Sequence, residues 1–257
     1  MIRTIVAFIV VVIASLFVTP FGIIAGVAGL LGLRKIRLAI MYPAMIFWSR
    51  LLLKMTGCKI SAKGRENIPL KGGVCFVCNH SGIADIVLFA GYCRRVVGFI
   101  AKKELIFVPI INLWIYLLGG LFIDRKNPRK ALKTINKGVE KIKAGGSMII
   151  FPEGSRSRGR GLLPFHPGSL KLATQAEAVI VPVAISGTYE LFEKKRRVDS
   201  SVHIKISFCK PVNTSEIPLT ERKQALADRI FAVIKEELEN GRAGIRTPDI
   251  HGVNVAL

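Results

Sequence analysis

Acidic side chains are scarce in this sequence. Asp and Glu together number 17, against 38 Lys and Arg, so the formal net charge is +21. This imbalance predicts an anionic partner, which means nucleic acid, an anionic membrane surface or a phosphorylated substrate. Because 51% of the residues are apolar and a soluble nucleic-acid binder has no use for a long apolar terminus, the composition favours a membrane and argues against nucleic acid.

Charge is missing altogether from Thr4 to Leu33, a run of thirty residues. As a straight helix this run would measure about 45 Å, against about 30 Å for the hydrocarbon core of a bilayer. Pro20 and Gly22 interrupt the run near its middle. We therefore expect either one kinked, tilted span or two short helices that dip into one leaflet as a hairpin. A signal peptide is disfavoured, because the apolar run is long, the basic region before it is a single Arg, and no clear small-x-small cleavage site precedes Arg34-Lys35.

The next segment, residues 36–55, mixes aromatic residues such as Trp48 with basic ones such as Arg50. This composition is typical of a helix that lies at a bilayer interface. A core helix packed on the rest of the protein is the competing interpretation. Together with the uncharged run, the segment predicts a membrane-anchoring helical region over residues 1–57.

The chain lacks the cysteine pattern of a zinc site. Of its five cysteines, only Cys75 and Cys78 form a C-x-x-C pair, and no second pair follows at zinc-site spacing. Both lie in an apolar run that is typical of a buried strand. We therefore expect core thiols and no metal site, and the odd cysteine count fits a reducing compartment.

Internal repeats and low-complexity linkers are also absent. From Cys58 onward, short apolar runs alternate with helical segments, which predicts an α/β domain over residues 58–240. The expected strands are 74–78, 97–101, 121–123, 147–151, 180–185 and 202–208. The final residues, 241–257, have no periodicity and are expected to be disordered.

Two helices stand out in this domain. Asn127 can cap the first and Pro128 suits its first position, while apolar residues recur at helical spacing before Gly145-Gly146 ends it. The second is expected over about residues 220–239.

A histidine follows the first of these strands. His80 comes two residues after the apolar run 74–78, and Asp85 follows five residues later, before another apolar segment. The pair suits a general base held by an acidic partner, since neutral histidine accepts protons near pH 7. The alternative is a histidine at a strand end and an aspartate that caps a helix.

Two further strands are expected to end in polar groups. Residues 119–125 form a glycine-led strand that runs out into Asp124-Arg125, and residues 151–158 place Glu153, Gly154 and Arg156 directly after a strongly apolar strand. Strand ends are where α/β proteins bind their ligands. A carboxylate, a glycine that lets the backbone approach, and arginines suit a phosphate-bearing polyol.

With these stretches in place, the sequence resembles the PlsC-type glycerolipid acyltransferases, chiefly the 1-acyl-glycerol-3-phosphate acyltransferases. The family's blocks occur in order over about residues 58–210: N-H-x-x-x-x-D at Asn79, His80 and Asp85, A-K-x-E-L at 101–105, a strand closing in I-D-R at 123–125, F-P-E-G-[ST]-R at 151–156, and V-P-V at 181–183. The resemblance implies a mixed β-sheet flanked by helices. It also implies transfer of an acyl group from acyl-CoA or acyl-carrier protein to the free hydroxyl of lysophosphatidic acid, giving phosphatidic acid.

In that reaction His80 would take the hydroxyl proton, and Asp85 would fix the imidazole tautomer and stabilise the imidazolium. No covalent acyl-enzyme, metal or cofactor is required. Backbone N–H groups near the Glu153-Gly154 turn or at the start of the helix after His80 are the two candidates for stabilising the oxyanion.

The resemblance also implies which residues bind the polar groups of the substrate. Cations for the acceptor phosphate are Arg125 and Arg156, with Lys102 as a further candidate, and Glu153, Gly154 and Ser155 complete the phosphate and glycerol site. Glu153 would hold a glycerol hydroxyl or order the arginines.

The sequence leaves alternative functions open. The acceptor can be glycerol 3-phosphate or another lysolipid, because the blocks encode acyl transfer better than acceptor identity. A non-catalytic basic protein that binds membranes or nucleic acid is the alternative of another class. The expected location is a membrane, the bacterial inner membrane with the active site on its cytoplasmic side.

Overall fold

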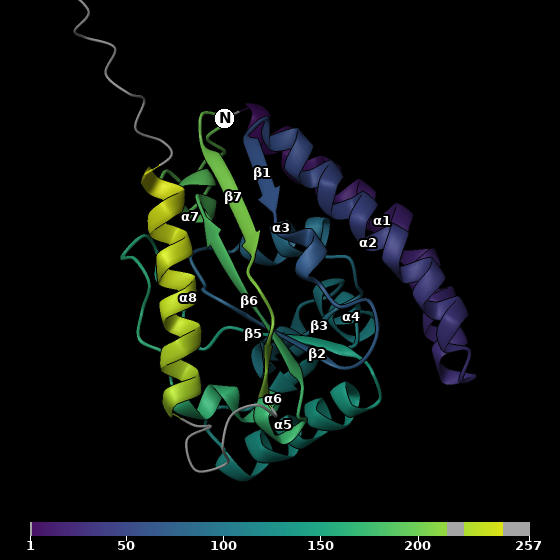
Figure 1. The fold of residues 1–257 in the computed structure, drawn as a ribbon. Helices are drawn as coiled ribbons and strands as arrows, with labels where there is room; N and C mark the ends of the chain where they lie inside the picture. The colour runs from purple at the N-terminus through teal and green to yellow at the C-terminus, as the bar shows by residue number, and fades with distance from the viewer. Residues whose placement is uncertain (1, 215–223, 244–257) are drawn as a thin grey trace, which may run out of the picture.

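The structure is a computed structural model that describes residues 2–214 and 224–243. Eight strands of these residues form one mixed sheet in the order β1-β7-β6-β2-β5-β3-β4, and β8 pairs with β6 (Figure 1). The strands are β1 (Lys59–Lys63), β2 (Val74–Cys78), β3 (Gly98–Lys102), β4 (Leu121–Ile123), β5 (Ser147–Ile150), β6 (Val179–Ser186), β7 (His203–Phe208) and β8 (Val212–Asn213). The predicted α/β fold with a mixed sheet is confirmed.

The central strands of the sheet run parallel. β2 pairs in parallel with β5 and β6, and β3 pairs in parallel with β5 and β4. Among the described strands, only β6 pairs in antiparallel fashion, with β7 and with β8. The ends of β2, β5, β3 and β4 therefore meet at one edge of the sheet, which is where the polar stretches of the sequence converge.

Helices cover both faces of the sheet. They are α1 (Ile2–Leu30), α2 (Arg34–Thr56), α3 (Asp85–Tyr92), α4 (Ile111–Leu117), α5 (Pro128–Lys143), α6 (Lys171–Gln175), α7 (Thr188–Leu191) and α8 (Gln224–Ala243), with short 3-10 turns at Arg65–Asn67, Lys103–Phe107 and Pro167–Leu170. As predicted, the Asn127 side chain accepts a hydrogen bond from the Lys130 amide at the start of α5. Helix α8 continues to Ala243, and the rest of the expected disordered tail, 244–257, lies outside the described residues.

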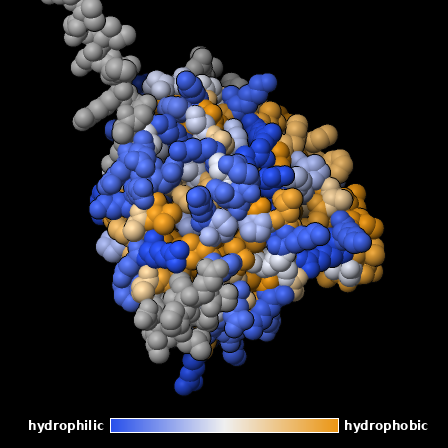
Figure 2. Space-filling model, viewed as in Figure 1, coloured by the Kyte–Doolittle hydropathy of each residue, from blue (hydrophilic) through white to orange (hydrophobic). Residues whose placement is uncertain are grey.

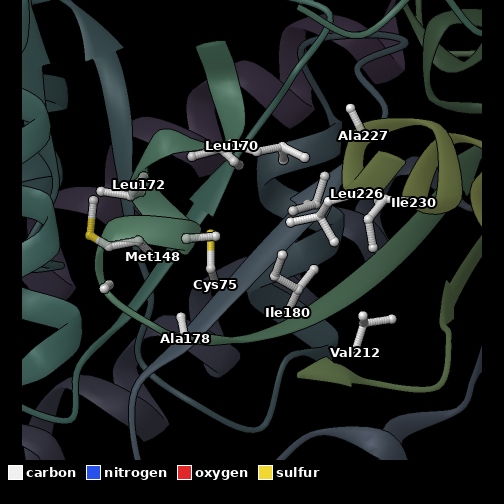
Figure 3. Packing of buried hydrophobic residues seen from close by; sticks show 14 of the residues in the cluster. Cys75, Met148, Leu170, Leu172, Ala178, Ile180, Val212, Leu226, Ala227 and Ile230 are labelled. Carbon is white, nitrogen blue, oxygen red and sulfur yellow. The ribbon is translucent and has the colours of Figure 1, made fainter. Parts of the chain in front are cut away.

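The alternation of β2 side chains divides the core into two halves. Cys75 and Val77 point into a cluster under α5, α6 and α8, to which Met148 and Ile180 also belong (Figure 3). Phe76 and Cys78 point the other way, into a cluster under α2 and α3. Both thiols of the C-x-x-C pair are fully buried and free, and burial raises the pKa of Cys75 to about 12. The expectation of core thiols is confirmed.

The N-terminal helices form a hairpin of two long helices. The uncharged run does not break at Pro20, and α1 continues through it, with a hydrogen bond from the Thr19 hydroxyl to the Ser15 carbonyl (2.6 Å) inside the helix. The expected hairpin within residues 4–33 is therefore wrong. α1 instead packs on α2, and hydrophobic surface gathers on the side of the molecule where these helices lie (Figures 1 and 2).

Gly22 serves close packing and does not interrupt α1. A Cβ at Gly22 would lie 2.6 Å from the Leu117 side chain of α4, and one at Gly26 would lie 3.0 Å from it. In α2, Met41 and Met45 are buried against the rest of the protein while Phe47 is 54% exposed, so one face packs as a core helix would, and the location of the other face at a bilayer interface stays a prediction. By length and composition, Val12–Leu30 and Arg34–Thr56 are each long and apolar enough to cross a membrane. The end of α2 at Thr56 matches the boundary at residue 57, and the division into an anchoring region and an acyltransferase domain stays a proposal.

Candidate active site

The polar stretches meet where the parallel strands end. His80 follows β2, Glu153 follows β5, Lys102 ends β3 and Arg125 follows β4. Because these four strands are neighbours in the sheet, the residues lie along one edge. Two backbone hydrogen bonds join the loops after β2 and β5: the Ser157 amide donates to the His80 carbonyl (2.7 Å), and the Arg158 amide donates to the Ser81 carbonyl (3.3 Å).

His80 and Asp85 form a hydrogen-bonded pair. The imidazole Nδ1 lies 2.7 Å from Asp85 Oδ2, and Asp85 is fully buried at the start of α3. The same Oδ2 accepts the amides of Ser81 (2.7 Å) and Gly82 (3.0 Å), while Oδ1 accepts the hydroxyl of Thr188. Because Asp85 is an acceptor, Nδ1 carries the proton in this network, and Nε2 is left with a lone pair.

The imidazole ring is held in place and still accessible. It stacks on Phe151, with ring centroids 4.1 Å apart and an interplanar angle of 25°. The His80 side chain keeps 18% of its exposure, so a substrate hydroxyl can reach it. Below it, the buried Asn79 side chain exchanges two hydrogen bonds with the Ile185 backbone (2.8 and 2.9 Å), which ties the end of β2 to β6.

Glu153 contacts the backbone of His80. Its Oε1 accepts the His80 amide (2.6 Å), and its Oε2 accepts the Leu163 amide (3.1 Å). The residue is only 3% exposed, and burial raises the pKa of its carboxyl above the ordinary value, although the two N–H donors act in the opposite direction. Through these two hydrogen bonds Glu153 fixes the loop that follows β2 at His80. Its expected contacts with glycerol or with arginines stay predictions.

Replacing Glu153 by Gln is expected to destabilise the fold. The glutamine amide would direct its NH2 group at one of the two backbone N–H groups, which would lose its acceptor. Leaving such a group unsatisfied costs about 1–3 kcal/mol. Urea unfolding measures this loss, and Glu140→Gln, an exposed carboxylate on α5, is the matched control. Equal unfolding free energies for the two variants would contradict this role of Glu153.

The expected phosphate-binding residues differ in their surroundings. Arg156 forms an ion pair with Glu193 (Nη1 to Oε1, 2.7 Å), and Arg125 donates to the Gly154 carbonyl. Gly154 adopts a positive φ of 69°, which favours glycine. Lys102 and Ser155 are exposed, and in the described part of the chain neither side chain has a hydrogen-bond partner. The structure thus links Arg125, Gly154 and Arg156 to the loop at His80, and leaves Lys102 and Ser155 at its margin.

Sequence reasoning missed two residues, both from the segment after β6. Thr188 begins α7 and donates to Asp85, and Glu193 follows α7 and holds Arg156. The second Glu193 oxygen accepts the Ile83 amide (2.7 Å), so this one carboxylate joins the loop after His80 to the loop after Glu153. The available signal was the strand-end position of Gly187-Thr188, directly after the V-P-V strand.

Comparisons with known proteins find relatives of this chain. A family model described as "Acyltransferase" matches residues 59–186. The 1-acyl-sn-glycerol-3-phosphate acyltransferase of Saccharomyces cerevisiae is 31% identical, over 84% of this chain and 72% of that protein. The protein of the same name from Salmonella typhimurium is 32% identical, over 75% of this chain and 80% of its own length.

A solved structure is also similar. The crystal structure of the 1-acyl-sn-glycerophosphate (LPA) acyltransferase PlsC from Thermotoga maritima aligns with a TM-score of 0.73 and 26% identity. The alignment covers 91% of this chain and 98% of that one.

Proposed function

Because this chain belongs to the family of PlsC-type 1-acyl-sn-glycerol-3-phosphate acyltransferases, we propose that it transfers a fatty acyl group to the free hydroxyl of lysophosphatidic acid, giving phosphatidic acid. The observation that carries the proposal is the His80–Asp85 pair beside two arginines at the sheet edge. The acyl donor is a thioester, acyl-CoA or acyl-carrier protein.

The chemistry requires one base and no covalent acyl-enzyme. His80 Nε2 takes the hydroxyl proton as the alcohol oxygen attacks the thioester carbonyl, and Asp85 stabilises the imidazolium that forms. The tetrahedral intermediate then collapses: the carbon–sulfur bond breaks, the ester remains, and the imidazolium returns its proton to the leaving thiolate.

Of the two candidate places for oxyanion donors, the turn after β5 fits better. The amides of Ser81, Gly82 and Ile83 after His80 already donate to carboxylates. In the described residues, by contrast, the amides of Ser155 and Arg156 have no protein acceptor. Free N–H groups aimed at the developing charge are what an oxyanion requires, so we assign these two amides to that role.

Arg156→Ala tests the assignment of the acceptor phosphate. Loss of a charge-assisted hydrogen bond costs about 1.5–3 kcal/mol, which corresponds to a fall of about 10- to 150-fold in kcat/KM for lysophosphatidic acid. The KM for the acyl donor should change little. Steady-state kinetics with each substrate varied in turn measures both effects, and Arg158→Ala, an exposed arginine of the same loop, is the control. Equal losses for acceptor and donor would show that Arg156 does not bind the phosphate.

The N-terminal hairpin and the family membership support membrane association. Hydrogen bonds from three arginines of α2 hold the hairpin against the domain along its length. Their acceptors are backbone carbonyls: that of Ala144 for Arg34, that of Leu117 for Arg37 and that of Gly91 for Arg50. A spanning hairpin would carry these parts of the domain into the hydrocarbon, so we propose that it lies in one leaflet at the interface. The basic net charge suits an anionic membrane surface. We propose that the site faces the cytoplasm, the side on which acyl-CoA and acyl-carrier protein are available, at the inner membrane if the source is a bacterium.

A further inference from the structure

An exposed apolar loop lies outside the N-terminal hairpin. It covers residues 106–111, from the end of the 3-10 turn Lys103–Phe107 to the first residue of α4, and its exposed side chains are Ile106, Phe107, Val108, Ile110 and Ile111, with Tyr116 of α4 nearby in sequence. Phe107 is 84% exposed and Tyr116 is 63% exposed. Contiguous apolar surface of this kind marks a site of interaction with a protein or a membrane.

The loop is built to hold these side chains outward. The Ile111 amide donates to the Pro109 carbonyl (2.7 Å), which closes a γ-turn at Ile110 with a φ of 67°. Positive φ is strained for a β-branched residue and persists only where the surrounding structure imposes it. The Asn112 side chain closes the loop by donating to the Ile106 carbonyl (2.7 Å). The fold thus maintains the exposure of the loop at an energetic cost.

The loop leads into α4, a helix that packs on the N-terminal helices. α4 starts at Ile111 and packs on α1, where Leu117 fits against Gly22 and Gly26. Arg37 of α2 donates to the Leu117 carbonyl (2.7 Å) and fixes α4 to the hairpin. The loop is thus connected through α4 to the helices that a lipid surface would receive.

Charge and position favour a bilayer as the occupant. Lys102 lies four residues before the loop and is exposed, and a basic residue near an anionic surface contributes about 1 kcal/mol of attraction. Lys103 is paired with Asp124 (2.8 Å) and Glu104 carries the opposite charge, so Lys102 is the lysine of this segment that can add to the attraction. In the β3–β4 register Lys102 pairs with Ile123, two residues before Arg125, so the loop borders the edge that carries the active site.

We propose that loop 106–111 is a second membrane-inserting element. Its insertion holds the edge of the sheet that carries the active site against the bilayer surface. The acyl chain of a lipid acceptor can then stay in the bilayer while its phosphate reaches Arg125. The inference rests on the proposed membrane association of the hairpin and is independent of the acyl-transfer assignment.

Tryptophan quenching by brominated lipids tests the insertion. Full-length Phe107→Trp is bound to phosphatidylglycerol–phosphatidylethanolamine vesicles with bromine at a shallow acyl position. The signal is the fluorescence difference from the wild type, which already contains Trp48 and Trp114. We expect the added fluorescence to be quenched, and that of Leu132→Trp, an exposed position on α5, to remain. An unquenched Phe107→Trp signal in vesicle-bound protein, or equal quenching at both positions, would overturn the proposal.

A charge substitution supplies an independent measurement. Phe107→Asp should weaken vesicle binding by about tenfold or more relative to Leu132→Asp, which adds the same charge elsewhere. Acyl transfer to lysophosphatidic acid in detergent micelles should be unchanged in Phe107→Asp, which separates this proposal from the catalytic one. Equal vesicle binding by the two Asp variants would contradict insertion of the loop.

Discussion

Replacement of His80 by Ala is expected to abolish acyl transfer and leave membrane association intact. General-base catalysis contributes about 10²–10⁴-fold to a rate, and no other described histidine pairs with a carboxylate. The His80 backbone contacts with Glu153 and Ser157 persist in the variant, so the loop should keep its conformation. The measurement is kcat for phosphatidic acid formation, together with vesicle co-sedimentation.

His203→Ala is the matched control for this variant. His203 opens β7 at the outer part of the sheet, where its Nε2 lies 2.8 Å from the Ser61 hydroxyl. Its replacement removes one exposed hydrogen bond and should leave turnover normal. Near-normal turnover in His80→Ala would refute the proposed mechanism.

Asp85→Asn is expected to have a comparably large effect. In the Ser-His-Asp hydrolases the corresponding change lowers kcat by about 10⁴-fold, because the histidine adopts the wrong tautomer. Here the amide NH2 would also face the Ser81 and Gly82 amides or the Thr188 hydroxyl, all of which donate to the carboxylate. We expect kcat to fall by about 10³–10⁴-fold. The KM for lysophosphatidic acid should change only slightly, since Asp85 is fully buried and does not touch the acceptor.

Thr188→Val separates the role of Asp85 in catalysis from its role in the fold. The variant removes one hydrogen bond to Oδ1 and keeps the carboxylate, so its thermal unfolding should shift while most of the activity remains. If Asp85→Asn and Thr188→Val lowered kcat equally at matched stability, the carboxylate would not be setting the tautomer.

Local patterns predicted much of the fold. Apolar runs marked six strands to within one residue at each end, and Asn127 with Pro128 marked the start of α5. β1 was not predicted, because its burial alternates between exposed and half-buried and its sequence, Lys-Ile-Ser-Ala-Lys, carries little apolar signal. The pairing of α1 with α2 was also missed, since Pro20 and Gly22 indicate a break unless the partner helix is known.

The site was predictable only where its residues are close in sequence. His80 and Asp85 lie five residues apart and pair as their spacing suggested. Thr188 and Glu193 reach the same loop from more than a hundred residues away, and no local spacing encodes such contacts. Glu153 was identified as a site residue, but its hydrogen bond to the His80 amide depends on the adjacency of β2 and β5, which only the sheet order reveals.

The most direct test of the account is the initial rate of acyl transfer by the purified full-length protein. The acceptors are lysophosphatidic acid, glycerol 3-phosphate and a lysolipid without a free phosphate, each assayed with acyl-CoA and with acyl-carrier protein as donor. We expect phosphatidic acid from lysophosphatidic acid with at least one of the donors, at a rate well above those of the other two acceptors. Preferential acylation of glycerol 3-phosphate or of the phosphate-free lysolipid, or no transfer with either donor, would contradict it.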